Sequence, residues 1–270
     1  MRGTSLASLS AAQRRFEPVL AAAGAEAITL GEQLFAVVDA LDSSGSLRRT
    51  LSDQSIEPGA KAGLVQGVLA RLDKRVVDVV TMLAQAHWSS AEDLVDAVEQ
   101  LGFDALLASA QAKGELERVE DELFRITRSL VGQREVRQAL FDPRVPGDKR
   151  ADLASSLLEG KVADATLAVA RRAAAAPRGR RFVATLSHVA DLAAARRERL
   201  VASVTSGSEL SQAQLDRLGG ILQQAYAQDL QLNVTVDPEI LGGLRIQVGA
   251  DVVDATVLAR LADARRRLAS

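Results

Sequence analysis

The chain has 270 residues, of which 47% are apolar and only 3% are aromatic, and its formal net charge is −2. This length allows one large or two ordinary domains, and a core built from Leu, Val and Ala favours helices over sheets. The charge balance is not that of a nucleic-acid-binding protein, and the absence of cysteine excludes disulfides and thiolate metal sites.

The sequence shows no targeting signal and no segment suited to crossing a membrane. Residues 1–16 lack the long apolar run of a signal peptide. A membrane helix needs about 20 mostly apolar residues, whereas the best candidate, which begins at Arg75, is shorter and contains Asp78. We therefore expect no direct membrane insertion by this chain.

About the first two hundred residues predict a succession of amphipathic helices. In residues 30–41, apolar side chains recur at steps of three and four, which places them on one face of a helix. Another helix is predicted to begin after Ser89, with Glu92 completing a capping box. Pro58 and Pro146 each mark a helix start, because the first helical turn tolerates a missing N–H.

Part of this helical region recurs after a shift of 89 residues. The shared pattern is an amphipathic helix, a short helix, a turn with Pro and another helix, and the match fades beyond about Leu72. The common register predicts two related helical bundles, too few repeats for a solenoid. The matched pairs are Leu34 with Leu123, Phe35 with Phe124, Leu41 with Leu130, Arg48 with Arg137, Leu51 with Leu140, Asp53 with Asp142, Ile56 with Val145, Lys61 with Arg150, Leu64 with Leu153 and Leu69 with Leu158.

A basic stretch follows the second copy of this pattern. Pro177 and Gly179 interrupt a helix there, and a long helix is predicted from about Arg181. Such a run is ordinarily a solvated face, but it also suits a docking surface for acidic residues of a partner. The candidate partner surface consists of Arg171, Arg172, Arg178, Arg180 and Arg181.

The pattern changes after Leu200, where a small α/β module is predicted. Alternating residues from Val201 predict a strand, and Ser211 with Gln214 predicts the capped start of a helix. Two more strands, a short return strand in 251–255 and a final helix follow. That helix is predicted to begin at Asp254 or Thr256, and its apolar side is lined by Leu258, Leu261 and Leu268.

The turn between the last two long strands has its own residue pattern. Asp237 and Pro238 are predicted to end one strand, because Pro cannot donate to the ladder. Residues 239–241 are predicted to form a short helical turn. Gly242 and Gly243 then allow the backbone to reverse through positive φ. The structural residues of this signature are Asp237, Pro238, Gly242, Gly243, Gly249 and Asp254.

These predictions describe a mainly α protein, with a duplicated N-terminal helical bundle followed by a small α/β domain. We expect a first bundle in 1–112, a second in 113–200, and a module of order strand–helix–strand–strand–helix in 201–270, with a three-stranded sheet.

The C-terminal stretch resembles the signature of the delta subunit of bacterial F-type ATP synthase, the family that includes the mitochondrial oligomycin-sensitivity-conferring protein. The shared order is Val-Asp-Pro, a short apolar turn, Gly-Gly, an alternating strand, a Gly-Asp-like turn, an apolar pair with Asp, and a Leu-rich helix, here in 236–268. The segments 47–69 and 136–158 are both similar to a segment that ordinary members carry once. The longer chain resembles actinobacterial members.

The resemblance implies a non-catalytic stator subunit without cofactors, catalytic residues or bound metal. The helical part would bind amphipathic helices of the alpha subunits, with contact to beta subunits as an option, and the C-terminal module would bind a b-type stalk subunit. The implied location is the cytoplasmic face of the cell membrane, peripherally within the complex, with no nucleic-acid partner.

Other interpretations of single features are weaker. Gly242 and Gly243 do not form a phosphate loop, because no Lys follows and a strand comes next. His87 and His188 are too few for a metal site, and His87 is predicted to pack with Trp88 at a helix end. The phenylalanines Phe16, Phe35 and Phe124 are predicted to be core residues.

Two further functions stay open at this point. A helical adaptor or regulatory scaffold outside ATP synthase would share the fold without binding the catalytic head. An enzyme with a nucleotide at the Gly-rich turn would need more basic or hydroxyl ligands there than Arg245 supplies.

Overall fold

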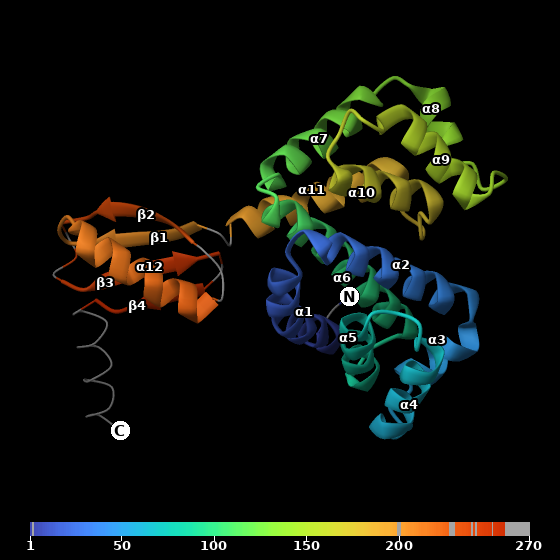
Figure 1. Cartoon of the computed structure of the whole chain (residues 1–270), viewed down its shortest axis with the longest axis horizontal. Coiled ribbons are helices and arrows are strands. Elements are labelled where there is room, and N and C mark those ends of the chain that lie inside the picture. The colour runs from blue at the N-terminus through green and yellow to red at the C-terminus, as the bar shows by residue number, and fades with distance from the viewer. Residues whose placement is uncertain are drawn as a thin grey trace. The chain divides into compact units, whose positions relative to one another are not determined.

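The computed structural model describes residues 1, 3–198, 201–226, 230–238, 240, 242–249 and 251–256, and the chain forms two compact units, Met1–Ala193 and Ala194–Ser270. The mainly helical fold with a small C-terminal sheet confirms the predicted fold class (Figure 1). The helical elements are α1 (Thr4–Ala23), η1 (Gly24–Glu26), α2 (Ala27–Ser43), α3 (Gly45–Ser52), α4 (Pro58–Val68), α5 (Lys74–Gln85), α6 (Ala91–Ala112), α7 (Leu116–Ser129), α8 (Arg134–Ala139), α9 (Gly147–Leu158), α10 (Asp164–Ala175), α11 (Phe182–Glu198) and α12 (Gln212–Tyr226).

The 89-residue interval governs the helix boundaries as well as the sequence. Shifted by 89 residues, α2 to α6 overlap α7 to α11 one by one, so the repeat continues well beyond Leu72, where the sequence match fades. We call α1–α6 (4–112) the first helical set and α7–α11 (116–198) the second helical set. Shifted by the same interval, α1 overlaps α6. The helix α6 is therefore the last helix of the first set, and it is also the equivalent of α1 for the second set.

Equivalent hydrogen bonds recur in the two sets. The buried cations Lys61 and Arg150 each donate to a carbonyl in the last turn of the following helix, Ala84 at 3.1 Å and Ala175 at 2.9 Å. The carboxylates of Asp53 and Asp142, 89 residues apart, each accept the amide two residues further on, at 2.8 and 2.9 Å. Local chemistry, and not only apolar spacing, is therefore repeated.

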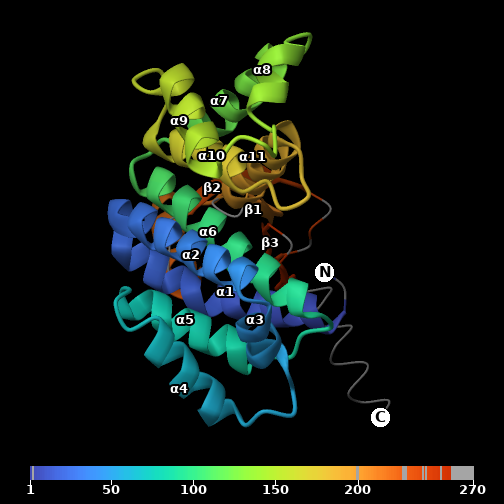
Figure 2. The same ribbon diagram turned by 90° about the vertical axis from the view of Figure 1, so that its right-hand side faces the viewer.

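The helix α6 forms the centre of the helical unit. Every residue from 101 to 110 is buried, which is the pattern of a helix covered on all sides. One face joins the core of the first set through Leu94, Val98 and Leu101. Figures 1 and 2 both show α6 between the other helices of the first set and the helices of the second set.

Two glycines bring α2 and α6 into close contact. A Cβ at Gly31 would lie 2.9 Å from the Gly102 carbonyl oxygen, and a Cβ at Gly102 would lie 2.6 Å from the Phe35 ring. That ring meets Phe103 edge to face, with centroids 5.1 Å apart. Such ring pairs add stabilisation beyond the area they bury.

The start of α6 corrects the predicted cap. Its N-cap is Ser90, whose hydroxyl accepts the Asp93 amide at 3.1 Å, so the prediction of Ser89 as cap was wrong. The Ser89 amide instead donates to the Ser5 hydroxyl of α1 at 2.8 Å. With two adjacent serines, this tertiary contact decides which one caps the helix.

One stretch of the described residues, Thr4–Ser43, is long and apolar enough to cross a membrane by length and composition alone. It comprises α1, η1 and α2 and is interrupted at Gly24, where φ is 56°. Its large side chains, such as Phe16 and Leu30, lie in the core of the helical unit. Its apolar composition is therefore explained by packing against α5 and α6.

The C-terminal unit holds a mixed sheet of order β2-β1-β3-β4, in which β1 pairs parallel with β2 and antiparallel with β3. The return strand predicted in 251–255 pairs with β3, so the sheet has four strands and not three. The helix α12 packs Leu218 and Leu222 against Ala202, Val204 and Val248. The strands are β1 (Val201–Ser206), β2 (Gln231–Val236), β3 (Leu244–Val248) and β4 (Asp251–Asp254).

The α2–α6 contact gives a stability prediction. In Gly102→Ala the new methyl group must displace the buried Phe35 ring, which we expect to cost about 1–3 kcal/mol of unfolding free energy. Gly63→Ala is the matched control, because a Cβ there meets open space and helix propensity favours Ala by up to about 1 kcal/mol. Urea denaturation followed by circular dichroism measures both, and a Gly102→Ala midpoint at or above that of the wild type would contradict this packing.

Candidate functional site

The C-terminal turn has the predicted backbone. The strand β2 ends at Val236, and the Asp237 amide donates to the Ser206 carbonyl at 2.8 Å. Gly242 and Gly243 have positive φ, at 130° and 87°, as the sequence predicted, and Gly249 also has positive φ, at 56°. Pro238 follows the strand directly, while the predicted helical turn at 239–241 includes Glu239 and Leu241, which lie outside the described residues.

Close backbone approaches explain Gly243 in this turn and Gly207, which follows β1. A Cβ at Gly243 would lie 2.4 Å from the Ala255 carbonyl oxygen, and one at Gly207 would lie 2.1 Å from the Ile240 carbonyl oxygen. The strand β3 begins directly after Gly243. The glycines therefore serve backbone packing, and this is not the strand–loop–helix setting of a phosphate loop.

Asp254 closes the described part of the signature. The Thr256 hydroxyl and amide donate to its carboxylate at 2.7 and 3.0 Å, and these hydrogen bonds lower the pKa of Asp254. This geometry fits a helix start, but the final helix predicted beyond it, with Leu258, Leu261 and Leu268, lies outside the described residues.

The same turn borders a surface groove of about 600 Å³ in the C-terminal unit. Gly242 and Gly243 form part of its wall, and α12 contributes Leu218 and Ile221. The Ile221 side chain is 53% exposed, although it is large and apolar. An exposed apolar groove with few charges suits a protein partner.

In the helical unit, the arginine cluster is directed mainly into the protein. Arg178 lies in the turn before α11, and its guanidinium contacts Asp42 at 2.9 Å, Asp96 at 3.2 Å and Glu99 at 3.5 Å. Arg180 also pairs with Glu99, which is only 3% exposed. These contacts join the second helical set to α2 and α6 of the first.

Arg178 makes these contacts from a strained backbone. Its φ is 45°, a left-handed value that no other non-glycine residue in the described part of the chain adopts. Such a conformation costs on the order of 1–2 kcal/mol. The strain is tolerated because the turn aims one guanidinium at three carboxylates.

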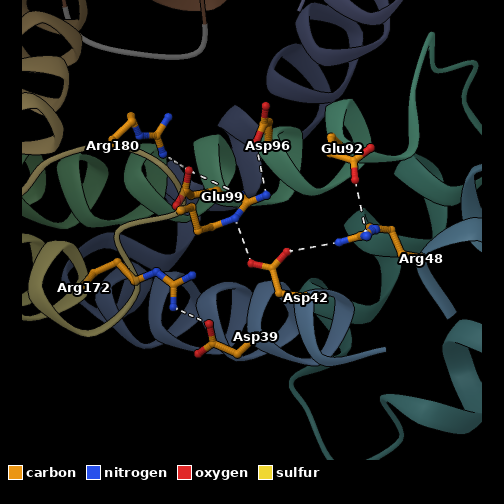
Figure 3. A network of polar contacts seen from close by, with 9 residues as sticks. Asp39, Asp42, Arg48, Glu92, Asp96, Glu99, Arg172 and Arg180 are labelled. Carbon is orange, nitrogen blue, oxygen red and sulfur yellow. Dashed lines mark hydrogen bonds and ion pairs between the residues drawn. The ribbon is translucent and has the colours of Figure 1, made fainter. Parts of the chain in front are cut away.

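The network extends to either side of Arg178 (Figure 3). Asp42 also contacts Arg48 at 3.7 Å, and Arg48 reaches Glu92 at 3.3 Å. Arg172, which is 6% exposed, pairs with Asp39 at 2.6 Å and lies 4.9 Å from the centroid of the Phe35 ring. An arginine over an aromatic face adds a cation–π attraction to the ion pair.

The structure therefore corrects the predicted partner surface. Arg172, Arg178 and Arg180 bind carboxylates of this same chain, since two helical sets of one chain supply the complementary charges. Arg171 is exposed and donates to the Ser155 hydroxyl, and Arg181 is exposed. Only these last two keep the exposure that a partner surface requires.

Arg181 lies at a second groove, of about 900 Å³, between α8, the loop that follows it and the start of α11. Its basic lining includes Arg134, Arg137 and Arg181, for which no ion pair exists among the described residues, and its apolar lining includes Phe141. The sequence predictions missed this groove. The available signal was the match of Arg48 with Arg137, which places an arginine at the same position in both copies of the repeat.

The one carboxylate in the lining of this groove is already bound. The side chain and amide of Arg144 donate to Asp142, and these hydrogen bonds lower the pKa of Asp142 to about 2. Asp142 therefore stays ionised at neutral pH and keeps Arg144 in place. The remaining arginines give the groove an excess of positive charge.

Two side chains with predicted roles lie elsewhere than expected. Phe124 was predicted to be a core residue, but it is 59% exposed, unlike its equivalent Phe35 at 7%. His87 is exposed, and only Trp88 packs at the helix end, where its indole donates to the Leu83 carbonyl at 2.7 Å. The amphipathic pattern alone did not distinguish a covered helix face from an open one.

His188 is a half-buried polar group and not part of a ligand cluster among the described residues. Its Nε2 lies 3.2 Å from the Gln100 side-chain oxygen, and burial together with the charge of Arg180 lowers its pKa. No group of three or more His, Asp or Glu side chains within the described residues is arranged to hold a metal ion.

Comparison with known proteins identifies the family. The family model described as ATP synthase delta (OSCP) subunit matches residues 104–268. A protein named ATP synthase subunit delta from Beutenbergia cavernae is 55% identical over 270 residues, covering 100% of both chains.

The chain belongs to the ATP synthase delta (OSCP) subunit family.

Other members agree over the whole length. Proteins named ATP synthase subunit delta from Kineococcus radiotolerans and Thermobifida fusca are 44% and 42% identical, covering 99% and 100% of this chain and 97% and 100% of theirs. A chain in a cryo-EM structure of the Toxoplasma gondii mitochondrial ATP synthase hexamer is 20% identical, covering 62% of this chain and 95% of that one, with a TM-score of 0.31 that carries no argument.

The residues matched by the family model are distributed unequally over the two helical sets. The match begins at residue 104, inside α6, and continues through the second set into the C-terminal unit. The family model therefore covers the second helical set and the sheet, and most of the first set lies outside it.

The arginine network gives the second prediction. In Arg178→Ala the carboxylates of Asp42, Asp96 and Glu99 lose a shared cation, and we expect a loss of about 3 kcal/mol in unfolding free energy. Arg125→Ala is the matched control, because Arg125 forms an exposed pair with Asp121 worth less than about 1 kcal/mol. Equal denaturation midpoints for the two variants would show that the network adds no stability.

Proposed function

We propose that this chain is a non-catalytic subunit of the peripheral stalk of an F-type ATP synthase. A rotary synthase turns a shaft inside its catalytic head, so the head must be held against rotation for torque to drive ATP synthesis from proton translocation. The observation that carries this proposal is full-length identity of 55% to a protein named ATP synthase subunit delta.

The helical part is the proposed contact with the head. It would bind helices of the alpha subunits in the manner of an amphipathic helix in a groove, with beta subunits as further neighbours. The open groove between α8 and α11 and the exposed side chains of Phe124 and Val131 support this assignment, because they leave apolar surface uncovered on the second set.

The C-terminal unit is the proposed contact with a b-type stalk subunit. Its groove combines the exposed Ile221 with the signature turn at Gly242 and Gly243, so the family signature and the apolar surface coincide. With this arrangement, one chain would carry load from the head to the stalk. The protein would act at the cytoplasmic face of the cell membrane as a peripheral part of the complex.

The two helical sets are proposed to be copies of one ancestral bundle, with boundaries near residues 112 and 200. The equivalent helices, the paired buried cations Lys61 and Arg150, and the paired turns at Asp53 and Asp142 support this origin.

The test is binding of the full-length chain to the purified alpha–beta head and to the soluble part of the b-type subunit, measured separately by interferometry. We expect the wild type to bind both, and Ile221→Asp to lose at least tenfold in stalk affinity while head affinity stays unchanged, because a charge enters the apolar groove. Val252→Asp is the matched control, since Val252 is also exposed, at 50%, but does not line the groove.

Absence of head binding at low salt would favour the adaptor alternative. Equal stalk affinity in Ile221→Asp would remove the C-terminal groove from the proposed interface.

A further inference from the structure

The two helical sets can be compared position by position, and one difference in charge lies in the groove between α8 and α11. In the first set, Arg48 of α3 pairs with Glu92 at the start of α6. The equivalent residues of the second set are Arg137 of α8 and Arg181 at the start of α11, and both line the 900 Å³ groove. A closed ion pair in one set is thus replaced by two like charges in the other.

Acidic residues of α2 near this position are also replaced by basic or apolar residues in the second set. Asp39 and Asp42 of α2 accept Arg172 and Arg178 in the first set. Their equivalents are Arg128 of α7 and Val131 in the turn that follows it, the latter 75% exposed. The first set thus presents carboxylates that are satisfied by the second, while the second presents unpaired arginines and apolar groups.

From this comparison we infer that the groove between α8 and α11 binds an acidic, amphipathic segment of a catalytic-head subunit, with its carboxylates on Arg137 and Arg181. The inference rests on the proposed function and specifies the surface and the chemistry of the contact. The first set shows such a contact within this chain, because there the carboxylate of Glu92 pairs with Arg48, the equivalent of Arg137.

The rest of the lining suits such a segment. Phe141 is 38% exposed and offers an apolar surface, while Arg134 adds a third guanidinium without an ion-pair partner among the described residues. The only acidic group in the lining, Asp142, is held by Arg144 and does not neutralise the others. A peptide with carboxylates beside one large apolar side chain would satisfy both parts of the groove.

Arginine supports a carboxylate partner more specifically than lysine does. The planar guanidinium donates two parallel hydrogen bonds to a carboxylate and keeps its charge at every physiological pH. Two such groups on one groove also repel each other, so an incoming anion relieves an unfavourable interaction as well as forming a new one.

The experiment uses the full-length chain and the purified alpha–beta head. Arg181→Glu restores the charge pattern of the first set, where a glutamate faces the equivalent arginine, so this variant should fold normally while its groove is closed to an acidic segment. Arg137→Glu is the second variant. For both we expect head affinity to fall at least tenfold at low salt, and the wild-type affinity to weaken as salt is raised.

Two controls accompany these variants. Arg14→Glu makes the same charge change on an exposed arginine of α1, away from the groove, and should keep wild-type affinity within about twofold. Arg181→Lys retains the charge without the planar fork, and it should retain more affinity than Arg181→Glu. Circular dichroism and thermal unfolding verify that each variant is folded.

The outcomes separate this inference from the proposed function. A wild-type chain that does not bind the head contradicts the proposed function itself. Wild-type binding with unchanged affinity in folded Arg137→Glu and Arg181→Glu overturns the groove assignment alone. An equal loss in Arg14→Glu, or a loss of stalk binding in place of head binding, likewise overturns it.

Discussion

The ion pairs between the two helical sets are the interaction on which the rest of the helical unit depends. Arg178 reaches three carboxylates from a left-handed turn, and Arg172 and Arg180 add contacts on either side. Buried charges are costly to leave unpaired, so these residues hold the second set in one orientation on α2 and α6. The shared helix α6 supplies the apolar surface, and the network fixes how the second set lies on it.

This arrangement determines which surfaces remain for other proteins. The first set uses its acidic face on α2 and α6 internally, whereas the second-set equivalents of Asp39 and Asp42 are the exposed Arg128 and Val131. In the proposed duplication, a bundle that closes on itself through ion pairs leaves one copy open. An open head-to-tail repeat has this property, because its last member retains an unused surface.

Much of the local structure could be predicted from the sequence. Helix spacing, proline starts and the positive φ of Gly242 and Gly243 depend on neighbouring residues, and the structure confirms them. What could not be predicted depends on residues distant in sequence. Arg172 meets Asp39 across 133 positions, and Ser5 decides which of two serines caps α6.

The candidate site illustrates the same limit. The arginines of 171–181 were predicted as one surface, yet three of them bind carboxylates on α2 and α6 that no local pattern connects to them. Phe35 and Phe124 occupy equivalent helix positions, but only Phe35 is covered, because the second set lies over it with Arg172. Sequence periodicity gives the apolar face of a helix, and only the tertiary arrangement says whether that face is occupied.

The most direct test of the central claim, that this chain is a mechanical link without chemistry of its own, is proton pumping by membranes that carry the synthase. Membranes depleted of the chain and then supplied with it are assayed for ATP-driven acidification, with ATP hydrolysis by the head measured in parallel. The account predicts that pumping returns as the chain approaches its stoichiometric amount, while the isolated chain hydrolyses no ATP. Full pumping in its absence, or turnover by the purified chain alone, would contradict it.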